Sequence, residues 1–386
     1  MRRIYLDHTA TTPLDPRVME AMRPCFSGTF GNASSVHSYG RDARELLERA
    51  RGTIAQAVGA EPAEVFFTSG GTEADNLAIM GVMSAVRGRE GIVTSSAEHH
   101  AVLEPCRHLS ENGKDVSFLP VDPYGAVDMD ALRLQVGERT ALVSIMHANN
   151  ETGTISAVPA IAGIAHQAGA LFHSDAVQSA GKIPLDVREL GVDLMTLSAH
   201  KMYGPKGIGA LFVRRGAPVD PMLHGGGQER GRRPGTENVP LAVGFAEAFR
   251  LAVQEREEES ARLRSLRDGL ERRVRELFPG IIVNGDPAAR LPHILNISFN
   301  AAEYSLEGDM LVMNMDLEGI AVTSGSACTS GSLEPSHVIR AMGRDEKTAK
   351  ATLRFSFGKG NTMDDVGYVA ERLKIVIERM LKKRTG

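Results

Sequence analysis

Short apolar runs alternate with helix-like segments between about residues 60 and 215. Most of these runs are continuously apolar, as expected for strands of a parallel sheet that is covered on both faces. The segments between them, such as 157–168, carry apolar residues at helical spacing. The pattern predicts an α/β domain with a mostly parallel, seven-stranded sheet. Its expected strands span residues 65–68, 92–94, 116–119, 141–145, 170–173, 194–197 and 209–213.

The pattern changes near residue 250. Residues 250–276 are dense in Glu and Arg and place Leu at helical spacing, which predicts a long amphipathic helix that bridges two domains. Strand-like runs at 294–299 and 353–357, followed by a helix at 363–382, indicate a smaller α+β domain. We therefore expect two domains, a large one over residues 16–255 and a small one formed by residues 1–15 and 256–386.

Composition and charge exclude several classes of protein. Charged residues make up 24% of the chain and apolar residues 42%, which is ordinary for a globular protein and excludes a disordered or collagen-like chain. No apolar run approaches the roughly 20 residues needed to cross a bilayer. The net charge of -4 shows no electrostatic footprint for nucleic acid or a membrane surface. We expect a cytoplasmic protein that binds neither.

Polar clusters follow nearly every predicted strand. Ligands of open α/β sheets bind outside the carboxyl ends of the strands. Five such clusters in succession therefore predict one convergent site. They begin at Ser69, Glu98, His147, His173 and Ser198.

The first cluster, Ser69-Gly70-Gly71-Thr72, leads into a helix-like stretch. Free backbone N–H groups at a helix N-terminus can receive a phosphate, and Ser198 and His200 could add donors from a neighbouring strand end. An ordinary glycine-rich turn capped by Thr72 would look the same. The chain has no Gly-x-x-x-x-Gly-Lys-Ser/Thr sequence, which disfavours a nucleoside triphosphate P-loop.

Lys201 directly follows an apolar strand, so we expect it at the rim of the sheet, partly desolvated, with a lowered pKa suited to a Schiff base. An isolated lysine here would more often be a solvated residue of a turn. Asp175, at the end of the preceding strand, changes this interpretation, because a carboxylate can pair with the protonated pyridine nitrogen of pyridoxal phosphate. A phosphate cup, a lysine and a carboxylate together fit this cofactor better than a metal.

Four histidines lie at strand ends, but each is at a different strand and none shows the helical His-x-x-x-His pattern of a zinc site. Such a histidine is usually a hydrogen-bonded structural residue. His99 is the best functional candidate, because an imidazole there could stack on a flat cofactor ring and move protons near neutral pH. The four are His99, His147, His173 and His200.

The chain has three cysteines, too few and too scattered for a disulfide framework or a cysteine zinc site. Cys328 lies among small and hydroxylic residues, which predicts a flexible, exposed loop over about residues 323–333. A thiol on such a loop is expected to be reactive. Cys25 and Cys106 are interpreted as buried, inert thiols.

With these residues in this order, the chain resembles the cysteine desulfurases of the NifS/IscS type, which belong to the class V aminotransferases and have the pyridoxal phosphate fold type I. The resemblance runs almost from end to end. The motifs that carry it are Tyr5-Leu6-Asp7-His8-Thr9-Ala10-Thr11-Thr12-Pro13, Phe30-Gly31-Asn32, Thr68-Ser69-Gly70-Gly71-Thr72-Glu73, Asn149-Asn150-Glu151, Ser198-Ala199-His200-Lys201, Gly235-Thr236 and Ser324-Gly325-Ser326-Ala327-Cys328-Thr329.

The resemblance implies an enzyme that converts L-cysteine to L-alanine and transfers the sulfur to its own cysteine as a persulfide, for iron–sulfur cluster assembly or another sulfur acceptor. It implies Lys201 as the cofactor lysine and Cα base, His99 as the ring-stacking acid/base and Cys328 as the nucleophile. Asp175 would meet the pyridine nitrogen and Gln178 the phenolic oxygen. The remaining implied contacts are Gly71, Thr72, Ser198, His200 and, from the second subunit of a homodimer, Thr236 to the phosphate; Asn150 to cofactor and substrate; and Arg354 and Asn32 to the substrate.

Three alternatives stay open from the sequence. A selenocysteine lyase would use the same residues, whereas another class V aminotransferase-type enzyme would not need Cys328. A sulfur-relay or scaffold-binding protein with a vestigial cofactor site is disfavoured, because Lys201, Asp175, His99 and Cys328 are all present. The chain ends soon after its last predicted helix, without the longer tail with which IscS-type members dock an iron–sulfur scaffold, so a NifS-like or other acceptor is equally expected.

Overall fold

The larger part of the molecule is built on a seven-stranded sheet. The structure is a computed structural model that describes residues 2–304, 306, 308–325 and 334–382. The strands of the sheet are β2 (Val65–Thr68), β3 (Gly91–Ser95), β4 (Asp115–Leu119), β5 (Thr140–Ser144), β6 (Leu171–Asp175), β7 (Leu194–Ser198) and β8 (Gly209–Val213). Their order is β2-β8-β7-β6-β5-β3-β4. β8 is antiparallel to both neighbours, and the other pairs are parallel.

All seven predicted strands of the mostly parallel sheet are confirmed, with ends that differ by at most two residues. The central strands β5 and β7 are buried at every residue, because helices cover both faces of the sheet. The edge strand β4 is only partly buried, and its sequence mixes apolar and polar residues accordingly. The inner strands could be predicted from apolar runs because they are buried along their whole length.

Helices form a layer on each face of this sheet. The apolar side chains of α4 (Gly71–Ala85) and α5 (His100–Glu111) share one core with Phe66, Ile92 and Leu142. On the other face, α3 (Ser38–Ala57), α7 (Val158–Gln167) and the first part of α9 (Val239–Leu277) enclose Phe67, Val143 and Phe172. The shorter helices of this part are α1 (Pro16–Met22), α2 (Pro24–Ser27), α6 (Met129–Gln135) and α8 (Val187–Leu190).

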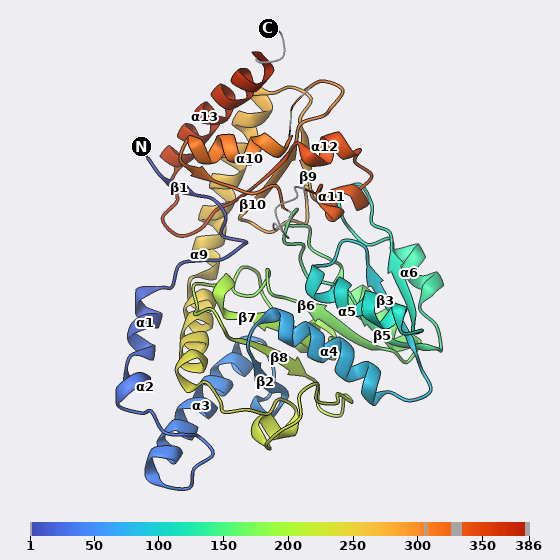
Figure 1. Ribbon diagram of the computed structural model, residues 1–386, viewed down its shortest axis with the longest axis vertical. Helices are drawn as coiled ribbons and strands as arrows, with labels where there is room; N and C mark the ends of the chain where they lie inside the picture. The colour runs from blue at the N-terminus through green and yellow to red at the C-terminus, as the bar shows by residue number, and fades with distance from the viewer. Residues whose placement is uncertain (1, 305, 307, 326–333, 383–386) are drawn as a thin grey trace.

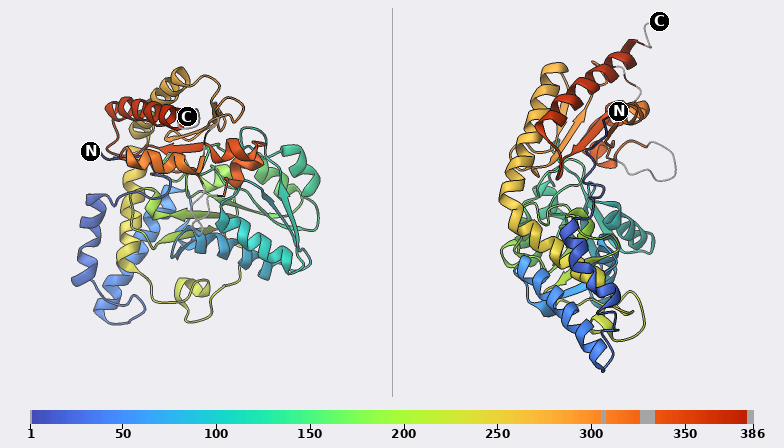
Figure 2. Two further views of the ribbon diagram at one scale, coloured as in Figure 1. Left: turned by 45° about the horizontal axis from the view of Figure 1, so that its top comes forward. Right: turned by 90° about the vertical axis from the view of Figure 1, so that its left-hand side faces the viewer.

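Helix α9 runs from the larger part of the molecule into the smaller one (Figures 1 and 2). Val239, Phe245 and Phe249 belong to the core beneath the large sheet, whereas Leu263 and Leu270 belong to the core of the smaller part. The predicted bridging helix is therefore confirmed, but its predicted start at residue 250 was wrong. The segment before residue 250 is apolar on most sides, because it is enclosed by α1, α3 and the sheet, and so it lacks an amphipathic period.

Among its described residues, the smaller part has two short sheets and four helices besides the second part of α9. β10 (Ile294–Ser298) pairs antiparallel with β12 (Thr352–Ser356) and β9 (Ile282–Asn284). β1 (Ile4–Tyr5) pairs in parallel with β11 (Ile320–Ala321), so the beginning of the chain lies in this part. The helices are α10 (Gly308–Leu317), α11 (His337–Ala341), α12 (Glu346–Lys350) and α13 (Met363–Lys382). The predicted strands β10 and β12 and the predicted final helix are confirmed, which completes the expected α/β plus α+β architecture.

Candidate active site

The carboxyl ends of β6 and β7 bring three predicted residues to one edge of the sheet. Asp175 is the last residue of β6 and Ser198 the last of β7. Because β6 and β7 are parallel neighbours, both ends lie on the same side. The 3-10 helix η2 (Ala199–Lys201) follows β7 at once and carries Lys201 at its end. This edge faces the smaller part of the molecule (Figure 1).

Lys201 lies against the N-terminal segment of the chain. Its Nζ donates to the backbone oxygens of Thr9 and Ala10, at 2.6 Å and 2.7 Å. Burial, together with the nearby positive charge of Arg354, lowers the pKa of Lys201 to about 8. A lysine with this pKa has an appreciable neutral fraction at physiological pH, as a nucleophilic or proton-accepting amine requires.

The Asp175 carboxylate is fixed by the backbone, since its Oδ1 accepts a hydrogen bond from Val177 N at 2.8 Å. Burial raises the pKa of Asp175 to about 6. A second carboxyl group, Asp75 of α4, is buried nearby, and burial and the charge of Asp175 raise its pKa well above the ordinary value. Asp175 is thus ionised at neutral pH and available to a cationic partner.

Ser198 and Gly71 form a small cradle beside η2. Ser198 Oγ is buried and has no hydrogen-bond partner in the structure. Gly71 is the first residue of α4, and a Cβ atom there would lie 3.0 Å from Val177 Cγ2, so a side chain would crowd the cradle. His200 approaches Thr11 Oγ1 through Nδ1 at 3.1 Å, and burial lowers its pKa to about 4. An unpaired hydroxyl beside a helix N-terminus suits an anionic group.

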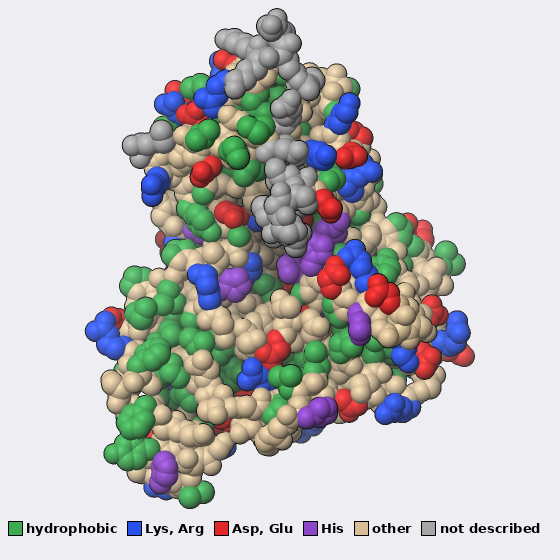
Figure 3. All heavy atoms as spheres, in the orientation of Figure 1, with side chains coloured by type: hydrophobic (Ala, Val, Ile, Leu, Met, Phe, Trp, Pro, Cys, Tyr) green, Lys and Arg blue, Asp and Glu red, His purple; other side chains and the backbone are tan. Residues whose placement is uncertain are grey.

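Two more predicted residues border this edge. His99 is the N-cap of α5, and its Nδ1 accepts a hydrogen bond from Ala101 N at 3.1 Å. The protein packed around the ring, and then the charge of Lys201, lower the pKa of His99 to about 4, so the imidazole is neutral. Gln178 Nε2 donates to the backbone oxygen of Thr9 at 3.1 Å. Histidine side chains gather on the face between the two parts of the molecule (Figure 3).

Arg354 of β12 reaches the same region from the smaller sheet. Its Nη2 donates to Asp7 Oδ1 at 2.8 Å and its Nη1 to the backbone oxygen of Asn150 at 2.9 Å. Its Nε is buried without a partner. The guanidinium is therefore held in place, and Nη1 and Nη2 each keep a second N–H that can be donated to a carboxylate.

Two predicted site residues are not brought together with the others, and a third lies outside the described residues. Asn32 lies on the loop between α2 and α3, and its Oδ1 accepts from Ser34 N at 2.8 Å. This loop is at the end of the molecule far from this edge (Figure 1). Thr236 is exposed on the stretch before α9 and stays a prediction that involves a second subunit. Cys328 lies outside the described residues. Thr72, at the cradle, is exposed.

Sequence reasoning assigned no role to Asp7, Asp75 or Lys182, although all three contact or approach site residues. Asp7 stands in the quoted N-terminal motif, which is the one signal that could have singled it out. Lys182 Nζ donates to the backbone oxygen of Lys201 at 3.0 Å, a contact that no pattern in the sequence indicates.

The two cysteines within the described ranges are free and buried, as predicted. Cys25 is 4% exposed and Cys106 is fully buried. Burial raises the pKa of Cys106 to about 12, so its thiol stays protonated and inert. In the same ranges, no group of three His, Cys, Asp or Glu side chains could hold a metal ion, and no helix is long and apolar enough to span a bilayer.

Comparisons with known proteins agree on one family. The aminotransferase class-V family matches residues 4–369. A cysteine desulfurase IscS of Dictyoglomus turgidum is 46% identical over 380 residues, which cover 98% of this chain and 95% of that protein. A solved NifS-like protein superposes with a TM-score of 0.90 at 38% identity, covering 98% of this chain and 100% of the other. The structure of SspA in complex with cysteine superposes with a TM-score of 0.81 at 35% identity, covering 92% and 99%.

Proposed function

The chain belongs to the class V aminotransferase family and is a cysteine desulfurase of the IscS/NifS-like type, and from this premise we propose the roles of its residues in the reaction. The observation that carries the proposal is the convergence of Lys201, Asp175 and the unpaired Ser198 hydroxyl at neighbouring strand ends. Arg354 joins them from the smaller sheet.

Membership of this family implies dependence on pyridoxal phosphate, and the residues present fit that cofactor. The unpaired Ser198 Oγ and the side-chain-free Gly71 leave polar space for its phosphate. We assign the phosphate to Gly71, Thr72, Ser198 and His200, with Thr236 from a second subunit. Lys201 would hold the cofactor and Asp175 its pyridine nitrogen, with Gln178, His99 and Asn150 as further contacts. When bound, pyridoxal phosphate withdraws electrons from the α-carbon of an amino acid.

The substrate is L-cysteine, and we propose that Arg354 and Asn150 bind its carboxylate. The bond from Arg354 to Asp7 fixes the guanidinium plane. Nη1 and Nη2 each carry a second N–H, and these are the donors that we propose for the substrate carboxylate. Asn32 stays a predicted substrate contact, and we propose that it contacts the substrate bound to a second subunit. Lys201, with its pKa near 8, then accepts the Cα proton as a neutral amine. His99, neutral at physiological pH, is a second proton acceptor on the same edge.

Sulfur transfer is assigned to Cys328. Its thiolate attacks the sulfur of the substrate, an S–S bond forms, and the S–Cβ bond breaks. The electron pair of that bond stays with Cβ, which takes up a proton so that the carbon skeleton leaves as alanine. Sulfur is thereby oxidised to the persulfide level while carbon is reduced, and no external oxidant is needed. An acceptor protein, such as an iron–sulfur scaffold, then takes the persulfide sulfur.

The test is incubation of the cofactor-loaded protein with L-cysteine, followed by mass spectrometry for alanine and for one added sulfur atom on the Cys328 peptide. Lys201→Ala should lose both the cofactor absorption band and alanine formation. Cys328→Ser should keep the band and lose the sulfur adduct. Lys206→Ala, which removes an exposed lysine of the same turn, is the matched control and should behave like the parent protein.

Three results would contradict the assignments. Normal turnover by Cys328→Ser would show that Cys328 is not the nucleophile. A keto acid in place of alanine would indicate an aminotransferase. Turnover of selenocysteine in marked preference to L-cysteine would indicate a selenocysteine lyase.

We propose a homodimer as the working form. Phe26, Phe30 and Tyr39, around the α2–α3 loop, are 62%, 65% and 55% exposed, and a cluster of large apolar side chains at a surface supports an interface. Subunit complementation tests this. Lys201→Ala and Thr236→Ala proteins, each inactive alone, should regain activity when refolded together, because the hybrid has one site with Lys201 from one subunit and Thr236 from the other. No recovery would refute the shared site.

We also propose the division into a large domain, residues 16–255, and a small domain, residues 1–15 and 256–386. The separate cores support it, since Ile4 and Leu6 pack with side chains after residue 260. The free thiols of Cys25 and Cys106 suit a reducing compartment, and we propose the cytoplasm.

A further inference from the structure

Lys182 lies directly beneath the turn that carries Lys201. Its Nζ donates to the backbone oxygen of Lys201 at 3.0 Å. Burial lowers the pKa of Lys182 to about 8. Burying the Lys182 ammonium costs free energy of folding. The ammonium donates to the backbone of another lysine and not to a carboxylate.

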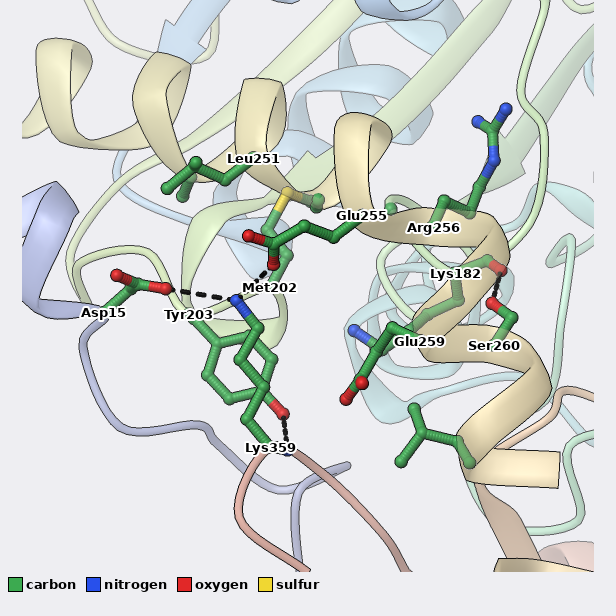
Figure 4. A pocket seen from close by; sticks show the side chains of 14 residues that line it. Asp15, Lys182, Met202, Tyr203, Leu251, Glu255, Arg256, Glu259, Ser260 and Lys359 are labelled. Atoms are coloured by element: carbon green, nitrogen blue, oxygen red, sulfur yellow. Dashed lines mark hydrogen bonds and ion pairs between the residues drawn. The ribbon is translucent and has the colours of Figure 1, made fainter. Parts of the chain in front are cut away.

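Helix α9 holds Lys182 in this position. Ser260 Oγ donates to the backbone oxygen of Lys182 at 2.7 Å, and the two side by side are seen in Figure 4. The neighbouring Gly181 has φ of +72°, and a Cβ atom there would lie 2.7 Å from Ala252 Cβ of α9. The segment is therefore pressed against the helix, and only glycine permits that approach.

The residues after Lys201 are held just as tightly. Tyr203 has φ of +64°, a left-handed conformation that a bulky residue adopts only when its surroundings impose it. Tyr203 N donates to Thr12 Oγ1 at 2.8 Å, and Tyr203 Oη accepts from the backbone N–H of Lys359 at 2.7 Å. The turn is thus held at two places. Lys182, which α9 binds, contacts the backbone of Lys201, and the backbone N–H of Lys359 in the smaller part contacts Tyr203.

The pocket between α9 and this turn is not a ligand site. It encloses about 30 Å³, room for one or two water molecules but not for a substrate. Its other ammonium, Lys359 Nζ, is paired with Asp15 Oδ2 at 3.1 Å and Glu255 Oε2 at 2.7 Å (Figure 4). Lys182 therefore acts on the protein itself.

We propose that Lys182 is a positioning residue for Lys201: by binding the backbone oxygen of Lys201 it fixes the η2 turn and presents the Lys201 amine to the cofactor and substrate. The inference rests on the proposed role of Lys201. Its charge has a second effect, because an ammonium beside Lys201 favours the neutral form of the Lys201 amine. The charged and titratable groups around the two lysines are Asp7, His99, Asp175, His200 and Arg354 for Lys201, and Glu259, Lys359, Tyr203, His8 and His293 for Lys182.

The test uses the full chain loaded with pyridoxal phosphate and the variant Lys182→Met. Two readouts besides activity are followed: the pH midpoint of the cofactor absorption change, which reports protonation of the Lys201 nitrogen, and the rate of cofactor dissociation. Loss of one nearby positive charge should raise the midpoint by about 0.5 pH unit or more. Loss of a charge-assisted hydrogen bond should speed dissociation about tenfold.

Lys359→Met is the matched control, because it removes an ammonium from the same pocket, keeps the backbone N–H that binds Tyr203 Oη and does not contact Lys201. It should change both readouts much less than Lys182→Met does. Lys182→Arg retains the positive charge and the N–H donors, so its pH midpoint should lie close to that of the parent protein. If Lys182→Met does not fold, Ser260→Ala loosens Lys182 more gently and should move the midpoint in the same direction. The proposal is overturned if neither Lys182→Met nor Ser260→Ala changes the readouts, or if Lys359→Met changes them equally. An unchanged band in Lys201→Ala would instead refute the proposed function.

Discussion

A buried ion pair fixes the loop that precedes Thr236, and its removal should destabilise the protein markedly. Arg51 of α3 and Glu229 of the 3-10 helix η3 (Gln228–Gly231) form two hydrogen bonds of 2.8 Å, with side chains only 3% and 2% exposed. Glu229 Oε2 also accepts from Phe67 N on the edge strand β2 at 2.8 Å. Glu229 and Arg230 have φ of +45° and +56°, so strained backbone depends on these contacts.

The expected cost of Glu229→Gln follows from this geometry. Removing one partner of a buried pair leaves the other charge uncompensated, at a cost of about 3–5 kcal/mol. Gln can still accept one of the hydrogen bonds, and Glu48 remains 3.2 Å from Arg51 as a partial counter-charge. We therefore expect the free energy of unfolding to fall by about 2–4 kcal/mol. Retention of pyridoxal phosphate should weaken as well, since the same loop carries Thr236.

The assay is urea unfolding followed by circular dichroism, with the free energy obtained by linear extrapolation. Asp130→Asn is the control, because it removes an ion pair of the same length, Arg133 to Asp130 at 2.7 Å, whose side chains are 59% and 90% exposed. A solvated pair of this kind should contribute almost nothing. If Glu229→Gln lost no more stability than Asp130→Asn, the argument from burial would be wrong.

Three further predictions concern buried titratable groups. Burial lowers the pKa of His173 to about 3, so between pH 6.5, its ordinary pKa, and pH 3 only the unfolded chain binds the proton. The free energy of unfolding should therefore fall as the pH drops below about 6.5, by up to about 1.4 kcal/mol per pH unit. Unfolding measurements on His173→Gln should lack this part of the pH dependence. Cys25 and Cys106 should resist iodoacetamide in the native protein and react only after unfolding, as read by peptide mass spectrometry. In cofactor-free protein, acetylation of Lys201 should be half-maximal near pH 8, and a midpoint near the ordinary value of about 10.4 would contradict its burial.

The fold was predictable where burial is continuous. The inner strands of the large sheet read as apolar runs because both of their faces are covered. The two-residue strands β1 and β11 were not predictable, because a pairing such as Ile4 with Ile320 depends on chain topology rather than local pattern. Residues 239–249 of α9 were not predicted as helix, because this segment is enclosed on several sides and lacks an amphipathic pattern.

The site divides in the same way. Asp175, Ser198 and Lys201 were predictable because each lies at the carboxyl end of an apolar strand or just beyond it, where ligands of such sheets bind. The bonds from Arg354 to Asp7 and from Lys182 to Lys201 were not, since each depends on how distant segments meet. Asp7 and Lys182, which carry little signal in the sequence, are thus the residues that bind Arg354 and Lys201 in the structure and shift the pKa of Lys201.

The meeting of residues 7–10 with β12 has a consequence for the order of synthesis. Thr9 N donates to Ser356 Oγ at 3.0 Å, Asp7 accepts from Arg354, and Lys201 rests on the Thr9 carbonyl. A nascent chain that has emerged from the ribosome as far as η2 already exposes its lysine, yet it has no β12 against which to seat its own first residues. The site can be completed only when nearly the whole polypeptide has emerged. A product truncated between α9 and β12 should therefore carry all seven strands of the large sheet and no reactive centre.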